Sequence, residues 1–308
     1  MTKPITFAGF PACSNVDQLI ADIAIIGIPY GTPYDASRAP STLNAADAIR
    51  QESACYPDDR IAWDFDLGGT LEGGTGVHVA DCGNLNGSQS DPEGNCETAK
   101  AAIKAILEAG AIPLVIGGDD SIPIPVMRAY EGQEPFYVLQ LDAHIDWRDH
   151  LNGIREGYSS TMRRASEMPW VKGIVQVGMR GVGSAREEEY QAAMAYGARL
   201  ITVSEIQKKG IGLALDELPE GSRCFITLDL DALDPGAMPA VDALSPGGLS
   251  YYEVVELFQS VMQKTRVVGV CVIALVPEMD VNAIGTNTAM RIIWTTIGGL
   301  ARAIQRQP

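Results

Sequence analysis

The order of apolar and amphipathic segments constrains the fold more than any other feature of the chain. Short apolar runs, typical of strands that are buried on both faces, alternate with segments of helical periodicity. Strands are expected at 22–28, 78–81, 112–116, 136–141, 174–177, 200–203, 224–230 and 267–274. Helices are expected at 41–50, 96–109, 186–196, 250–264 and 286–304. This order predicts an α/β fold in which a mostly parallel sheet is covered by helices on both faces.

Composition limits the function classes open to such a fold. The chain has 308 residues, 46% of them hydrophobic, and shows no repeat or linker, so a single domain over residues 1–308 is expected. Its 23 basic and 39 acidic residues give a net charge of -16, which argues against nucleic acid or an anionic membrane as a partner. The six scattered cysteines and the lack of a signal peptide or membrane span predict a cytoplasmic protein.

Two of the expected strands end in carboxylates set two residues apart. One reads Asp142-Ala-His144-Ile-Asp146 and the other Asp229-Leu-Asp231. Side chains at i, i+2 and i+4 of a strand share a face, so these five converge if the two strands are neighbours. Carboxylates packed together at buried strand ends need a cation between them. Oxygen ligands with one imidazole suit Mn²⁺ or a similar divalent ion.

Five segments carry a resemblance to a known family. They are IIGIP at 25–29, GGDDS at 117–121, LDAHID at 141–146, LDLDALDP at 228–235 and PGGL at 246–249. With them the chain resembles the ureohydrolase superfamily of arginases and agmatinases, and its agmatinase-like branch most. The resemblance implies a three-layer α/β/α fold with an eight-stranded sheet and a site for two divalent ions, Mn or Ni. It also implies a metal-bridging hydroxide that attacks a guanidine, biguanide or amidine carbon and releases urea.

The resemblance also implies roles for individual ligands. Asp142 and Asp229 would bridge the two ions, Asp146 would bind the first, and His144 and Asp231 would bind the second. The family's glycine-glycine-aspartate motif is normally followed by a metal-binding histidine, which is replaced here by an aspartate. That residue, Asp120, can still coordinate but adds a negative charge. A replacement imidazole could come only from His78 or His150, the other two histidines of the chain.

The substrate pocket departs from the family pattern as well. The stretch 157–164 contains Ser159 and Ser160 but lacks the histidine that relays protons in most relatives. The glutamate that anchors the guanidinium group is replaced by Ala274, and Glu278 is the nearest acid in sequence. Asp242 lies in a segment that replaces a wall of the family's pocket. These five residues are the candidates for substrate binding.

Three hypotheses follow from this mixture of kept and lost residues. The chain is an active hydrolase, or a subunit of one, that acts on a small cationic guanidine, biguanide or amidine. Alternatively, it is a catalytically degenerate subunit that packs beside an active paralogue, as in the heteromeric biguanide (metformin-type) hydrolase of this superfamily. A plain agmatinase is the least supported, because of Asp120 and Ala274. The family's trimers and hexamers make a homo- or hetero-oligomer the expected assembly.

Overall fold

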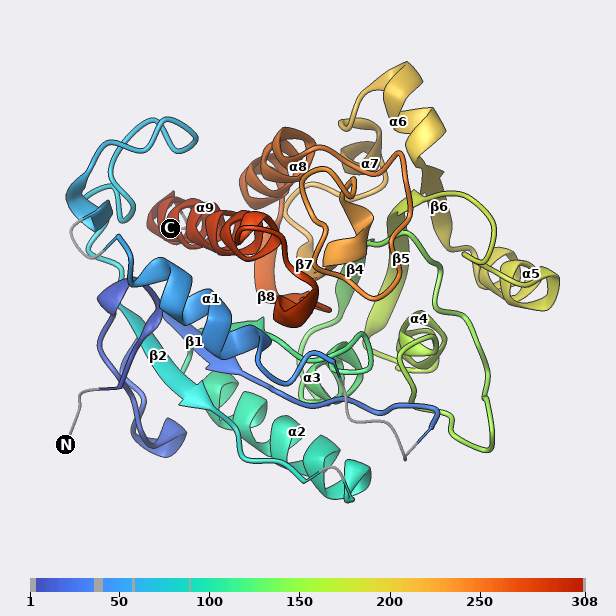
Figure 1. The fold of residues 1–308 in the computed structure, drawn as a ribbon, viewed down its shortest axis with the longest axis horizontal. Helices are drawn as coiled ribbons and strands as arrows, with labels where there is room; N and C mark the ends of the chain where they lie inside the picture. Colours follow the sequence, from blue (N-terminus) through green and yellow to red (C-terminus); the bar gives the residue numbers. More distant parts are fainter. Residues whose placement is uncertain (1–3, 36–40, 57–58, 89, 307–308) are drawn as a thin grey trace.

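A single eight-stranded sheet forms the centre of the protein (Figure 1). The computed structural model describes residues 4–35, 41–56, 59–88 and 90–306. All paired strands run parallel, in the order β2-β1-β3-β8-β7-β4-β5-β6. The strands are β1 (Ile23–Gly27), β2 (Val79–Asn84), β3 (Ile112–Ile116), β4 (Phe136–Leu141), β5 (Val171–Met179), β6 (Arg199–Thr202), β7 (Arg223–Asp229) and β8 (Arg266–Ile273).

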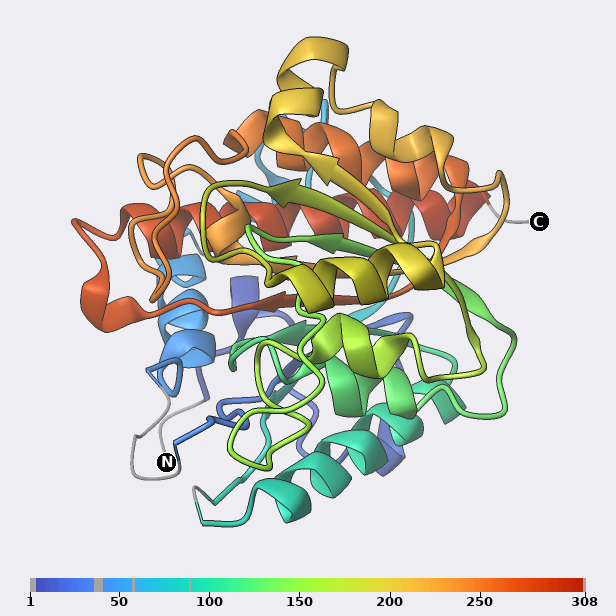
Figure 2. The same cartoon turned by 90° about the vertical axis from the view of Figure 1, so that its right-hand side faces the viewer.

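Helices cover the sheet on both faces, as Figures 1 and 2 show. One layer contains α1 (Ala45–Ser53), α6 (Val203–Lys209), α7 (Leu213–Asp216), α8 (Tyr251–Lys264) and α9 (Ile284–Arg306). The opposite layer contains α2 (Pro92–Glu108), α3 (Pro123–Arg128), α4 (Thr161–Ala165) and α5 (Glu187–Tyr196). Short 3₁₀ helices lie in the connections, at Phe7–Gly9, Val16–Gln18, Asp59–Ile61, Leu230–Ala232 and Pro277–Met279. The predicted three-layer α/β/α fold with a parallel sheet of eight strands is confirmed.

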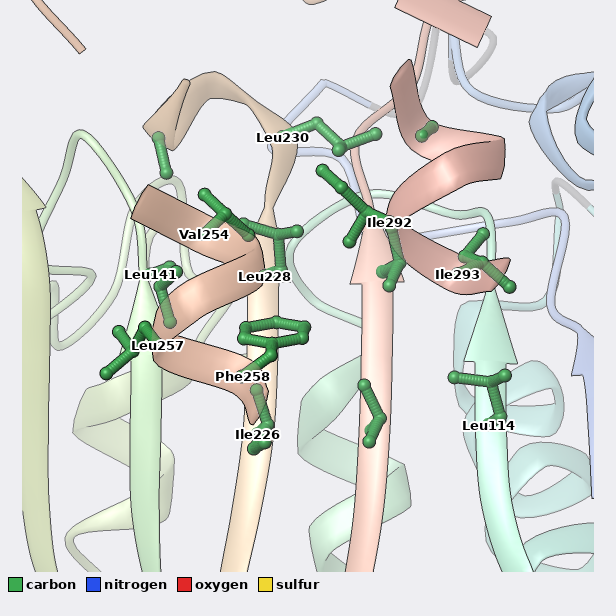
Figure 3. Close-up of a cluster of buried hydrophobic side chains, with 14 of the residues drawn as sticks. Leu114, Leu141, Ile226, Leu228, Leu230, Val254, Leu257, Phe258, Ile292 and Ile293 are labelled. Carbon is green, nitrogen blue, oxygen red and sulfur yellow. The ribbon is translucent and has the colours of Figure 1, made fainter. Parts of the chain in front are cut away.

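Alternation along the central strands divides the hydrophobic core into two clusters. On β7, Ile226 and Leu228 face the layer of α8 and α9, whereas Phe225 faces the layer of α2 and α3. Figure 3 shows the first cluster, in which Phe258 and Ile292 pack down onto the strands. Burying one such side chain contributes about 1.5–3 kcal/mol, so these two clusters hold the three layers together.

The expected helices differ from the observed ones mainly at their starts. The first was expected from residue 41, but 41–44 form a turn and α1 begins at Ala45. Helix α2 begins four residues before the expected residue 96, because Asp91 accepts a hydrogen bond from Gly94 N–H and Pro92 occupies the first turn. Helices α3, α4, α6 and α7 were not predicted, since segments of four to seven residues show little periodicity.

No helix among the described residues is long and apolar enough to cross a membrane. The single domain stays a prediction.

Candidate metal centre

The predicted ligands lie at the carboxyl ends of strands in the middle of the sheet. Strands β4 and β7 are neighbours, and Leu141 pairs with Leu228. Asp142 and Asp229, the residues that follow this pair in the sequence, are therefore side by side. Asp120 follows β3, two places from β7 in the sheet, with only β8 between them. In open parallel sheets this edge is where ligands bind.

Tight turns, and not strand alternation, bring the acidic side chains together. Strand β4 ends at Leu141, so the argument that residues 142, 144 and 146 share one face of a strand was wrong. Asp142 Oδ1 accepts a hydrogen bond from His144 N–H at 2.6 Å, and Asp146 has a φ of 51°. After β7, Asp229 Oδ1 accepts from the N–H of Asp231 at 2.8 Å. In both loops an aspartate bonds the backbone two residues on, which turns the chain back over the strand end.

Two overlapping groups of side chains have the composition of metal ligands. Asp142, His144 and Asp231 form one, and Asp120, Asp142 and Asp229 form the other, with the ligand atoms of each group within 4.8 Å of one another. Asp142 belongs to both groups, and its bridging position stays a prediction. Asp229 belongs to one group, and Asp146 to neither. Asp146 lies close enough to raise the pKa of Asp120 and of Asp142, after the larger effect of their burial.

Asp120 provides the test of whether a cation fits here. Both of its carboxylate oxygens are buried and accept no hydrogen bond from any described residue. Burial, followed by the charges of Asp146, Asp142 and Asp229, raises its pKa well above the usual value. A buried carboxylate without a donor is costly, and a divalent ion would compensate both its desolvation and the repulsion from its neighbours. The residues present therefore fit a metal ion.

His144 is held between the two carboxylates of its group. Its Nδ1 lies 3.2 Å from Asp142 Oδ1 and 3.1 Å from Asp231 Oδ2. Burial lowers the pKa of His144, but the hydrogen bond to Asp231 and the surrounding carboxylates outweigh it and raise that pKa to about 9. An imidazole must be neutral to bind a metal, so a bound ion would displace a proton from this ring.

Without metal, the protein should lose stability as the pH rises from 6.5 to about 9. His144 has a higher pKa in the folded than in the unfolded chain, so its contribution is complete below 6.5 and disappears through about 9. The raised pKa values of Asp120, Asp142 and Asp229 act in the same direction, because their ionisation is less favourable in the folded state. Melting temperatures in EDTA across this range would measure the effect. Excess Mn²⁺ should make the melting temperature depend less on pH. A melting temperature in EDTA that stays constant across this pH range would contradict the prediction.

The ligands line a cleft of about 830 Å³. Ser159, Asp242 and Ala274, three of the residues predicted to bind substrate, line the same cleft, and their role stays a prediction. Ser160 is not among its lining residues: its hydroxyl is buried and pairs with that of Tyr34 at 2.8 Å. Glu278 is exposed, accepts a hydrogen bond from the Asn44 side chain and does not line the cleft. Glu278, which was predicted to bind substrate, therefore does not extend into the cleft.

Neither alternative histidine reaches the ligand groups. His78 is exposed, with Nδ1 3.7 Å from Asp22, and His150 is exposed beside Asp149 at 3.0 Å. Among the described residues, His144 is therefore the one histidine that belongs to a ligand group.

Sequence reasoning missed several residues of the cleft and its support. Tyr34 and Tyr158 line it, with ring centroids 4.8 Å apart, and come from segments without periodicity. Gln140 donates hydrogen bonds to two of the acidic ligands. Its signal was available, because it is a polar residue inside an apolar strand, one place before that strand ends at Leu141.

Overlapping groups of carboxylate and imidazole side chains lie at the carboxyl edge of a parallel sheet. This fold and this site place the chain in the class of candidate metal-dependent α/β proteins. Comparison with known sequences gives the family within that class. The sequence model of the arginase family matches residues 21–298, and the chain belongs to this family.

Individual relatives agree with this assignment over most of the chain. Proclavaminate amidinohydrolase of Streptomyces clavuligerus is 30% identical over 93% of this chain and 90% of its own length. Human mitochondrial guanidino acid hydrolase is 27% identical over 87% of this chain and 74% of its own. The solved structure of the Streptomyces clavuligerus enzyme superposes with a TM-score of 0.83 at 27% identity, covering 98% of both chains. Agmatine ureohydrolase of Thermoplasma volcanium, at 24% identity and a TM-score of 0.82 over 100% of this chain and 98% of its own, shares the fold. The related proteins are ureohydrolases, which cleave C–N bonds.

Proposed function

We propose that this chain is a subunit of a hydrolase that uses two divalent ions to cleave a C–N bond of a guanidine, biguanide or amidine and release urea. The observation that carries the proposal is the buried carboxylate of Asp120, which lies beside Asp142 and Asp229 and has no hydrogen-bond donor among the described residues. Asp120, Asp142, His144, Asp146, Asp229 and Asp231 would hold the ions. When bound, these ions would supply a water acidic enough to act as a nucleophile at neutral pH.

The rest of the cleft favours a cationic substrate. Eight aspartates line it, whereas no lysine or arginine does among the described residues. Two divalent ions would not neutralise all eight carboxylates, so a positive guanidinium or amidinium group gains favourable electrostatic energy on entry. Asp242 at the cleft wall accepts a hydrogen bond from Ser41 and would offer its carboxylate to a ligand N–H. The bound ion would be Mn²⁺ or Ni²⁺. The chain would assemble into a trimer or hexamer in the cytoplasm.

Two measurements test this proposal. Purified chain loaded with Mn²⁺ or Ni²⁺ should contain close to two ions per chain by elemental analysis. It should also release urea from one or more small guanidines, biguanides or amidines, whereas EDTA-treated chain should not. Fewer than about one tightly bound ion per chain would contradict the active-enzyme proposal.

Ala274 and Asp120 favour a second candidate function. Ala274 lines the cleft where a carboxylate would anchor the substrate, and Asp120 makes the ligand set more negative. A chain with both changes could serve as the non-catalytic subunit of a hetero-oligomer with an active paralogue. In that case the chain alone would release no urea, and the paralogue would need this chain for full activity. Recovery of metal binding in Asp120→His would then identify the lost imidazole as the cause.

A further inference from the structure

Two glutamines lie fully buried beneath the metal centre. Gln140 on β4 and Gln176 on β5 are direct partners across the parallel sheet, and both have 0% exposure. They share their face of the sheet with Val138 and Ile174, which belong to the apolar cluster next to α3 and α4. A buried amide is costly unless its hydrogen bonds are made, so their partners need to be identified.

The indole of Trp147 fixes the direction of every bond in this group. Trp147 is 2% exposed, and its N–H, which can only donate, bonds Gln176 Oε1 at 2.7 Å. The amide of Gln176 therefore has its Nε2 on the other side, where it donates to Gln140 Oε1 and, at 2.8 Å, to the carbonyl oxygen of Ile145. Since Gln140 Oε1 is an acceptor here, Gln140 Nε2 has to point toward the metal centre.

Gln140 uses both amide hydrogens on two of the acidic ligands. Its Nε2 donates to Asp142 Oδ2 at 2.8 Å and to Asp146 Oδ2 at 2.7 Å. One donor group thus ties together carboxylates that would otherwise repel each other, in a loop where Asp146 has the unfavourable φ of 51°. Every donor of the three side chains has a partner, so the group has one arrangement and not two flipped ones.

We infer that Trp147, Gln176 and Gln140 form a positioning relay for the metal ligands Asp142 and Asp146. The relay rests on the proposed metal centre and adds residues that do not themselves coordinate. It acts before any ion arrives, because it sets which carboxylate oxygen of each aspartate is engaged and in which direction the other points. Ligands held in place in this way bind an ion with less reorganisation.

Mn²⁺ titration calorimetry of EDTA-treated protein tests the relay. Gln140→Met keeps the length of the side chain and removes both donors, and it should weaken Mn²⁺ binding by about 10–100-fold. Trp147→Phe removes the indole N–H together with part of the ring, frees the Gln176 amide to flip, and should weaken binding less than Gln140→Met. Melting curves in EDTA would show that each variant is folded at the temperature of the titration.

Matched controls separate the relay from general damage to the core. Gln133→Met and Trp170→Phe make the same chemical changes near α3, where Gln133 accepts from Arg223 and Trp170 donates to the Met127 carbonyl. Both should keep the Mn²⁺ affinity of the wild type. Folded Gln140→Met and Trp147→Phe proteins with unchanged affinity would overturn the relay alone. Absence of Mn²⁺ binding by the wild type would overturn the relay and the proposed metal centre together.

Discussion

Replacing Asp120 with asparagine should raise the melting temperature of the metal-free protein and weaken its binding of Mn²⁺. The Asp120 oxygens are buried, have no donor in the part of the chain that the structure describes, and lie near other carboxylates, so removing the charge relieves desolvation and repulsion. Each kcal/mol added to the free energy of unfolding raises the melting temperature by about 2–4 °C in a chain of about 150–250 residues, so the rise in this longer chain should be at the lower end of that range. Loss of the charged ligand should weaken Mn²⁺ binding by at least the roughly 10–100-fold seen for outer partners of metal ligands. Melting in EDTA and Mn²⁺ titration measure the two effects.

A second variant at the same site should behave in the opposite way when the metal is absent. Asp142 accepts hydrogen bonds on both oxygens, from Gln140 and from His144 N–H. In Asp142→Asn an amide nitrogen would face one of these donors, so the melting temperature in EDTA should fall while Mn²⁺ binding is also lost. Asp216→Asn, at an exposed aspartate of α7, serves as the control and should change neither quantity. Asp120→Asn with a lowered melting temperature in EDTA would contradict the account of Asp120.

Replacing Ala274 with glutamate should create an anchor for guanidinium groups. Ala274 follows β8, lines the cleft and is held by a bond from its N–H to the Gly118 carbonyl at 2.8 Å. Its φ of 69° is already strained for a residue with a β carbon, so a longer side chain adds little backbone cost. A carboxylate that pairs in two places with a guanidinium contributes about 1.5–3 kcal/mol, or roughly 10–100-fold in affinity.

Calorimetric titration of the metal-loaded protein with agmatine would measure this gain. Ala274→Gln has nearly the same size without the charge and should give little of it. If Ala274→Glu binds agmatine no better than the wild type, then position 274 is not the guanidinium anchor that the family resemblance implies. Asp242, which also lines the cleft, would then be the next residue to replace.

The sheet could be predicted because its strands carry a strong signal. Each central strand is an apolar run buried on both faces, and the predicted segments 112–116 and 136–141 coincide with β3 and β4. Short helices were missed even where local signals existed. Thr202 and Glu205 form a capping box at the start of α6, for example, yet seven residues are too few to show an apolar stripe.

The ligand set could be predicted for a reason that was partly wrong. The acidic residues were found from their spacing along the expected strands, but they converge because loops turn over the strand ends. Spacing in the sequence does not distinguish residues on a strand from residues in a tight turn. Ser160 and Glu278 were placed near the substrate by sequence position, whereas the first pairs with Tyr34 and the second with Asn44. Which partner a polar side chain finds depends on segments far away in the chain, and a single sequence does not contain that information directly.

The candidate ligands come from separate loops, each of which follows a different strand of the sheet. The loop after β3 carries Asp120, the loop after β4 carries Asp142, and Asp229 ends β7. The stability of the molecule resides in the apolar strands and helices beneath them, so one loop can change its chemistry while the others keep theirs. Such an arrangement allows evolution to alter the site one position at a time without unfolding the protein. A duplicated copy of such a protein can therefore exchange site residues gradually while its fold stays intact.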